Sequence, residues 1–287
     1  MQKNPSLLPK YNKLITTLDK RPLVCTSIIK DNEKDYFESL VKAMEGGSDL
    51  GELRIDFFNK INHEDLFRIM SKSQLPLIVT NRNKENGGSF AADEELRLSL
   101  LRSSIESKPA FIDIELSTNE KDRSDIITTA RENSVGVICS YHDFTNTPNP
   151  KEIISIYRKV CKAGADLAKL VFTPHTNKDV QNILEATESL RYESTPFTLF
   201  GMGKKGQITR MVCPLLGASL IYCSLINNTQ NGLYQLSLAN TKSFILHIEK
   251  QGWKSIKEKR KNLMTLAMIK LDDDGSYPPK SIDKAMA

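Results

Sequence analysis

One lysine stands inside a stretch that otherwise has the composition of a buried β-strand. Lys169 lies in residues 165–172, with small and apolar residues on both sides. Burial disfavours a charged ammonium, so such a lysine either extends its head to water or is kept as a neutral amine. A neutral amine attacks carbonyl carbons and forms Schiff bases. Lys169 is therefore a candidate nucleophile; the alternative is a strand-end lysine whose stem covers apolar surface.

A histidine stands at the end of the apolar run before that strand. His142 follows residues 135–141 and precedes Asp143. An imidazole transfers protons near neutral pH, although a His-Asp pair is also common in surface turns. Because the two runs are consecutive, His142 and Lys169 are expected on neighbouring strands. A lysine iminium acidifies the adjacent C–H bond, so this pair suits a β-elimination or an aldol-type reaction.

Two arginines in loop-like segments are candidates for binding an anion. Arg82 follows the apolar run 75–80, and Arg210 follows the glycine-containing run 201–206. A planar guanidinium binds a carboxylate through two parallel hydrogen bonds, although each arginine alone could be an ordinary surface residue. The run 201–206 lacks the spacing of a phosphate-binding loop.

The elements that must position these residues alternate between two kinds. Eight short apolar runs cover residues 23–29, 50–58, 75–80, 110–116, 135–141, 165–172, 196–200 and 219–226. Helix-like segments between and after them include 33–45, 64–71, 93–107, 151–162, 178–190, 207–216 and 239–251. This alternation predicts an α/β fold with a parallel sheet, and eight units predict a (β/α)8 barrel. A doubly wound sheet is the rival, but no GxGxxG turn follows the first strand.

Charged residues recur at every second position of two predicted strands. Glu52, Arg54 and Asp56 share one face, and Asp113 and Glu115 share another. Parallel strands covered on both faces are usually apolar throughout. An edge strand with a solvated face would explain one such pattern. Two patterns in one chain favour a polar mouth at the C-terminal end of a barrel, where active sites lie.

Composition indicates an ordinary globular protein. Of 287 residues, 39% are hydrophobic and 26% charged, and the net charge is +5. No apolar run approaches the roughly 18 residues of a membrane span, and no nucleic-acid-binding signature is present. The five cysteines lack metal-ligand spacing and are interpreted as reduced core thiols. We expect a cytoplasmic protein with a barrel over residues 1–250 and a basic, then acidic, C-terminal extension over 251–287.

Taken together, six segments resemble type I 3-dehydroquinate dehydratases. They are Glu52-Leu53-Arg54-Ile55-Asp56, Thr80-Asn81-Arg82 with Gly87-Gly88, Ile112-Asp113-Ile114-Glu115-Leu116, Ser140-Tyr141-His142-Asp143-Phe144, Ala165-Asp166-Leu167-Ala168-Lys169, and Met202 through Arg210. The resemblance extends from about residue 22 to residue 247, in the family's order and spacing. Two positions differ from the family pattern: Asn86 replaces a glutamate, and the last loop reads Asn231-Gly232-Leu233-Tyr234-Gln235.

The resemblance implies a barrel that converts 3-dehydroquinate to 3-dehydroshikimate by syn elimination of water. It assigns the imine to Lys169, proton transfer to His142 and the substrate carboxylate to Arg210. Residues that would hold or cover the substrate are Glu52, Arg54, Arg82, Met202, Tyr222 and Gln235, with Gln235 in a loop that closes over it. It implies no metal, no organic cofactor and a small-molecule substrate. The sequence does not fix the oligomeric state, and a homodimer is a separate expectation. The alternatives are another Schiff-base lyase, such as a sugar-phosphate aldolase, or a catalytically silent barrel that acts as a binding protein.

Overall fold

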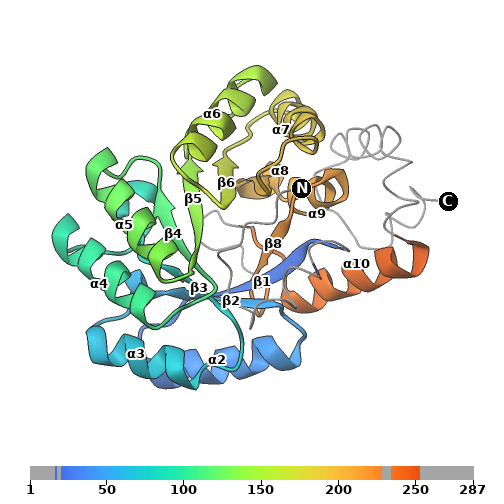
Figure 1. The fold of residues 1–287 in the computed structure, drawn as a ribbon. Helices are drawn as coiled ribbons and strands as arrows, with labels where there is room; N and C mark the ends of the chain where they lie inside the picture. Colours follow the sequence, from blue (N-terminus) through green and yellow to red (C-terminus); the bar gives the residue numbers. More distant parts are fainter. Residues whose placement is uncertain (1–16, 18–20, 228–233, 253–287) are drawn as a thin grey trace.

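Eight parallel strands form a nearly closed barrel in the computed structural model, which describes residues 17, 21–227 and 234–252 (Figure 1). The strands are β1 (Leu23–Ile28), β2 (Leu50–Arg54), β3 (Leu77–Thr80), β4 (Phe111–Glu115), β5 (Gly136–His142), β6 (Leu167–Phe172), β7 (Phe197–Gly201) and β8 (Leu220–Cys223). Their order is β7-β6-β5-β4-β3-β2-β1-β8. Two hydrogen bonds join the outer strands, from Ser219 N to Phe197 O (2.7 Å) and from Thr198 Oγ1 to Leu220 O (2.8 Å). The predicted (β/α)8 barrel is confirmed.

Helices follow the strands and surround the sheet (Figure 1). They are α2 (Glu33–Glu45), α3 (His63–Lys72), α4 (Glu94–Glu106), α5 (Glu120–Glu132), α6 (Pro150–Lys162), α7 (Asn177–Leu190), α8 (Gly203–Gly206), α9 (Thr209–Leu216) and α10 (Leu238–Gln251). Seven of them begin after an Asn, Asp, Ser or Thr whose side chain accepts a backbone N–H of the first turn. Such caps satisfy donors that the helix leaves unpaired and fix where each helix starts.

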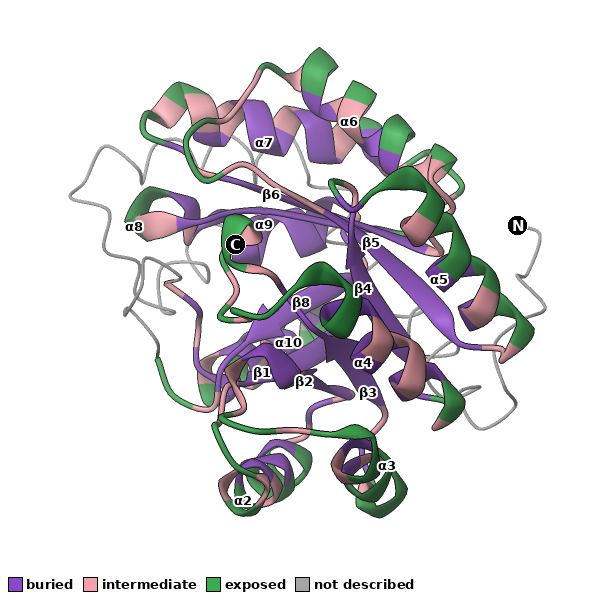
Figure 2. Cartoon of the chain, turned by 90° about the vertical axis from the view of Figure 1, so that its left-hand side faces the viewer, coloured by how far each residue is buried: buried purple, intermediate pink, exposed green. Residues whose placement is uncertain are grey.

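The interior face of the strands changes character along its length. Near the N-terminal ends, apolar residues such as Leu50, Phe111, Ile138 and Leu167 contact one another inside the barrel. Two residues further along each strand, the same face carries Glu52, Asp113, Ser140 and Lys169. Most helices bury one side against the outer face of the sheet and expose the opposite side, whereas α9 is buried along its whole length (Figure 2). The apolar layer therefore forms a floor beneath a charged C-terminal mouth.

One residue of the second strand lies elsewhere than expected. We predicted Asp56 on the same strand face as Glu52 and Arg54, but β2 ends at Arg54 and Asp56 lies in the 3-10 helix η2 (Ile55–Phe57). There it accepts two hydrogen bonds from Arg54, Nε to Oδ1 (2.9 Å) and Nη2 to Oδ2 (2.7 Å). It also accepts one from Ser89 N (3.0 Å). The strand stops because the chain turns at the mouth and the aspartate folds back onto the arginine.

The cysteines, the lengths of the helices and the end of the barrel also bear on the sequence predictions. All five cysteines are free, and four of them are buried. Within the described residues, every helix is too short or too polar to cross a bilayer. The last described helix, α10, ends at Gln251. The proposed extension therefore lies outside the described residues from position 253, and the boundary at 250 stays a prediction.

Candidate active site

A cavity opens at the C-terminal mouth of the barrel. Its volume is about 550 Å³, including the open entrance. All the site residues predicted from sequence line it: Glu52, Arg54, Arg82, His142, Lys169, Met202, Arg210, Tyr222 and Gln235. They come from β2, β5, β6 and β8 and from segments after β3, β7 and β8. The barrel thus brings together residues that are up to 183 positions apart, from Glu52 to Gln235.

Lys169 lies at the base of this cavity and is surrounded by carboxylates. It is 5% exposed, so its head does not extend to open solvent as a surface lysine would. Its Nζ donates to Asp113 Oδ2 (2.8 Å) and lies 3.7 Å from Glu52 Oε1. On another side, the ring of Tyr222 lies 4.2 Å from Nζ, a distance typical of a cation–π contact. The amine is held in a fixed place facing the cavity.

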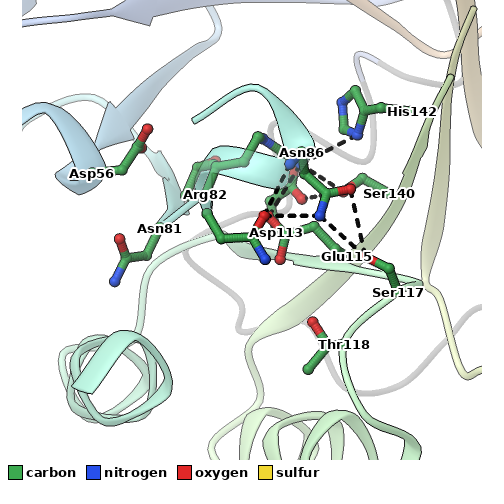
Figure 3. Close-up of polar contacts among 12 residues, drawn as sticks. Asp56, Asn81, Arg82, Asn86, Asp113, Glu115, Ser117, Thr118, Ser140 and His142 are labelled. Carbon is green, nitrogen blue, oxygen red and sulfur yellow. Dashed lines mark hydrogen bonds and ion pairs between the residues drawn. The ribbon is translucent and has the colours of Figure 1, made fainter. Parts of the chain in front are cut away.

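Asp113 is the anchor that joins Lys169 to Arg82. Arg82 Nη2 donates to Asp113 Oδ2 (2.7 Å), and Ser140 Oγ donates to Oδ1 (2.6 Å) (Figure 3). Burial by itself would raise the pKa of Asp113. The cations of Arg82 and Lys169, with hydrogen bonds from Lys169 and Ser140, hold that pKa well below its ordinary value. Asp113 is therefore a carboxylate at neutral pH and balances the positive charges beside it.

His142 is held next to the same arginine. Its Nδ1 lies 3.3 Å from Arg82 Nη1, and its ring stacks on Phe144 at 5.8 Å between centroids. A guanidinium donates hydrogen bonds and cannot accept them, so this contact suits a neutral imidazole and opposes an imidazolium. Burial, followed by the charges of Arg82 and Lys169, lowers the pKa of His142 well below its ordinary value. The resting imidazole is neutral and is able to accept a proton.

The rim of the cavity next to His142 carries an amide. Asn86 lines the cavity, whereas its neighbour Glu85 is exposed to solvent. The Asn86 amide donates to Asn83 Oδ1 (2.8 Å) and to Ser117 Oγ (3.1 Å). The structure therefore does not bring the nearest carboxylate into the position of Asn86.

The opposite wall combines a buried arginine with apolar side chains. Arg210 is 4% exposed, and its guanidinium carbon lies 4.3 Å from the ring centroid of Phe200. Burial lowers the pKa of Arg210 to about 9. Met202, Tyr222 and Gln235 line the cavity around it. A carboxylate entering beside Arg210 would compensate a guanidinium that has lost much of its hydration.

Three further charged residues support this site, although none of them was assigned an individual role from the sequence. Asp113 and Glu115 were noticed as charges on one strand face, and the structure places both on Arg82. Arg97 lies on α4 and reaches Glu115 from outside the barrel. Its position in an amphipathic helix gave no signal, because a helical arginine usually faces water. Among the described residues, no three His, Cys, Asp or Glu side chains gather as a metal site.

Comparison with known proteins gives the family. The family model described as type I 3-dehydroquinase matches residues 24–250. This chain belongs to that family. A 3-dehydroquinate dehydratase of Methanosarcina acetivorans is 34% identical over 234 residues, which cover 79% of this chain and 95% of that protein. A 3-dehydroquinate dehydratase of Clostridioides difficile is 29% identical and covers 82% and 96%.

Solved structures of the type I family share the fold. A type I 3-dehydroquinate dehydratase from Clostridium difficile, solved with covalently modified comenic acid, has a TM-score of 0.76 and 27% identity, covering 81% of this chain and 94% of that one. The enzyme from Geobacillus kaustophilus has a TM-score of 0.74 at 24% identity, covering 80% and 91%. A 3-hexulose-6-phosphate synthase from Salmonella typhimurium, at 12% identity and TM-score 0.53, shares the barrel fold alone.

Proposed function

We propose that this protein is a hydro-lyase that removes water from 3-dehydroquinate and releases 3-dehydroshikimate through an imine on Lys169. The observation that carries the proposal is a buried lysine that shares one cavity with a neutral imidazole and a buried arginine. Membership of the type I 3-dehydroquinase family supports the substrate. The aldolase alternative has no comparable support, because the 3-hexulose-6-phosphate synthase among the structural neighbours shares only the fold with this chain.

The first stage forms the imine. The Lys169 ammonium passes one proton to the neutral imidazole of His142, and the freed nitrogen pair adds to the ketone carbon while the C=O electrons move to the oxygen. A second proton then moves from the nitrogen to that oxygen, which gives the neutral carbinolamine. The first proton then returns from His142 to the carbinolamine hydroxyl, which leaves as water. The resulting iminium keeps the single positive charge that the ammonium carried. Asp113, ionised at 2.8 Å from the lysine nitrogen, stabilises that charge throughout the stage.

The second stage removes water from the substrate. The iminium withdraws electrons from the neighbouring carbon, so His142 takes its proton and an enamine forms. The enamine electrons expel the hydroxyl on the next carbon, and His142 returns the proton to it, so that water leaves. One base that acts first and then donates the same proton explains loss of both groups from one face. Water then adds to the conjugated iminium, and the ketone product leaves Lys169.

The remaining cavity residues bind and orient the substrate. Arg210 takes the carboxylate, for which a buried guanidinium is well suited. Glu52 and Arg54 face the cavity as partners for hydroxyl groups, and Arg82 lies between them and His142. Met202, Tyr222 and Gln235 line the cavity, where the first two would pack against the ring. The predicted closure of the last loop concerns residues 228–233, which lie outside the described residues.

Turnover tests the proposal directly. Purified protein is mixed with 3-dehydroquinate, and the ultraviolet absorbance of the conjugated product is followed. A rise in absorbance that requires Lys169 supports the proposal; no rise with correctly folded protein would refute the substrate assignment.

The cytoplasmic location, the homodimer and the lack of nucleic-acid binding stay predictions. Light scattering during gel filtration measures the oligomeric state.

A further inference from the structure

A buried arginine outside the cavity is connected to its centre. Arg97 on α4 has no exposed surface. Its Nη1 donates to Asn81 O (2.7 Å) and Glu115 Oε2 (2.8 Å), and its Nη2 to Glu94 Oε1 (2.7 Å) and Thr118 Oγ1 (3.1 Å). Its Nε donates to Glu94 Oε2 (2.7 Å). All five N–H groups of the guanidinium are thus used, which fixes its orientation.

Glu115 carries this connection into the active site. Its two oxygens are divided between two arginines: Oε2 accepts from Arg97, and Oε1 accepts from Arg82 Nη1 (3.2 Å). Arg82 Nη1 in turn lies 3.3 Å from His142 Nδ1 (Figure 3). A continuous chain of contacts therefore runs from α4 through Glu115 and Arg82 to the imidazole.

We propose that Arg97 is a positioning residue. It keeps the Glu115 carboxylate in place, and that carboxylate holds Arg82 against His142 and Asp113. Arg97 does not line the cavity and does not touch the substrate. This inference rests on the proposed function, in which His142 must stay neutral beside Arg82 to accept a proton.

The charges around Glu115 explain why Arg97 is needed. Arg82 faces it from the end of β3, Arg97 from α4, Asp113 from its own strand β4, and the Cys139 thiol from β5. Burial raises the pKa of Glu115, with Asp113 adding to the rise, while the two arginines oppose it. Without Arg97, Glu115 would bind a proton at higher pH. A neutral Glu115 no longer balances the charge of Arg82.

The first test is the pH profile of kcat. In Arg97→Gln we expect a loss of about 10- to 100-fold, by analogy with the loss of outer-shell residues that orient metal-ligating histidines. The loss should be larger on the acidic side, because protonation of Glu115 releases Arg82. Arg97→Lys restores a cation and should return the profile toward that of the wild type. Arg102→Gln is the matched control, since Arg102 is on the same helix and pairs with exposed Asp125.

Two measurements separate positioning from a general loss of structure. Destabilisation alone would lower kcat equally at every pH at which the variant is folded, as followed by circular dichroism. In a double-mutant cycle, Arg97→Gln should cost little further activity once Glu115→Gln is present, because both act through one carboxylate. A wild-type pH profile in Arg97→Gln, or losses that multiply in the double variant, would overturn the proposal.

A third measurement does not depend on the substrate. Titration of the Glu115 side-chain carboxyl is followed by carbon-13 NMR of glutamate-labelled protein and assigned with Glu115→Gln. We expect a higher titration point in Arg97→Gln than in the wild type, and no shift would contradict the role of Arg97. The titration point of Glu115 could be higher in Arg97→Gln than in the wild type while the wild type does not turn over 3-dehydroquinate. In that case the proposed function fails and the Arg97–Glu115 connection stands.

Discussion

Replacing Asp113 by asparagine would separate its charge from its shape. Asp113 Oδ2 accepts from both Arg82 and Lys169, and Oδ1 accepts from Ser140. An asparagine can keep its oxygen toward the two cations while its NH2 group donates to the serine hydroxyl. The hydrogen bonds can therefore survive, and the negative charge is what is lost.

The size of the effect follows from what remains around the two cations. Removing one partner of a buried ion pair typically costs about 3–5 kcal/mol, because the other charge is left uncompensated. Here Glu115 lies 3.2 Å from Arg82 and Glu52 lies 3.7 Å from Lys169, so part of the charge stays balanced. We therefore expect Asp113→Asn to cost about 3 kcal/mol, which lowers the Tm by roughly 6–12 °C for a domain of this size.

The cost should depend on pH in one direction. In the folded protein the pKa of Asp113 is held below 3.8, its ordinary value in an unfolded chain. Its contribution to the free energy of unfolding is therefore complete above that ordinary value. It is lost as pH falls through the folded-state pKa. Thermal unfolding of both proteins across pH should therefore show a constant gap near neutral pH that narrows in acid. Asp125→Asn, at the exposed partner of Arg102, should change stability by less than about 0.5 kcal/mol. Equal stability of Asp113→Asn and wild type at neutral pH would refute the assignment of Asp113 as the ionised anchor.

Two further predictions concern turnover. His142→Ala should lower kcat by about 10²- to 10⁴-fold, because this one group carries the protons of both stages; a wild-type kcat would remove His142 from its role. Arg210→Lys keeps a cation but loses the planar fork, so KM should rise about 10- to 100-fold with a smaller change in kcat; an unchanged KM in steady-state kinetics would show that Arg210 does not bind the carboxylate.

The positions of the strands and of the polar mouth could be predicted from sequence because they depend on short-range patterns, whereas Met202, Tyr222 and Gln235 were expected only from the resemblance to the family. Short apolar runs mark the strands, and period-two charges mark the polar mouth, as at Asp113 and Glu115. Helix α5 was harder to recognise, since Ile126, Ile127 and Ala130 are its buried residues and the rest is polar. A helix held by so narrow an apolar stripe leaves a weak periodic signal.

Contacts that depend on how the chain folds could not be predicted from the sequence. Asp56 was expected on a strand face, but the fold places it in a turn, where it binds Arg54. Arg97 reads as a surface residue of an amphipathic helix, and it is buried because Glu94, Glu115 and Thr118 surround it. The pairing of Glu115 with Arg97 and Arg82, and through Arg82 its link to His142, cannot be predicted from residue spacing. These four residues come from four separate parts of the chain.

Borohydride trapping would show whether the substrate is bound to Lys169 as an imine. Protein, 3-dehydroquinate and borohydride are mixed, and the reduced protein is digested and analysed by mass spectrometry, with Lys169→Ala as the control. We predict a stable adduct on the peptide that contains Lys169, and neither adduct nor turnover in the variant. Turnover by Lys169→Ala at the wild-type rate, or an adduct on another lysine in active protein, would contradict the account.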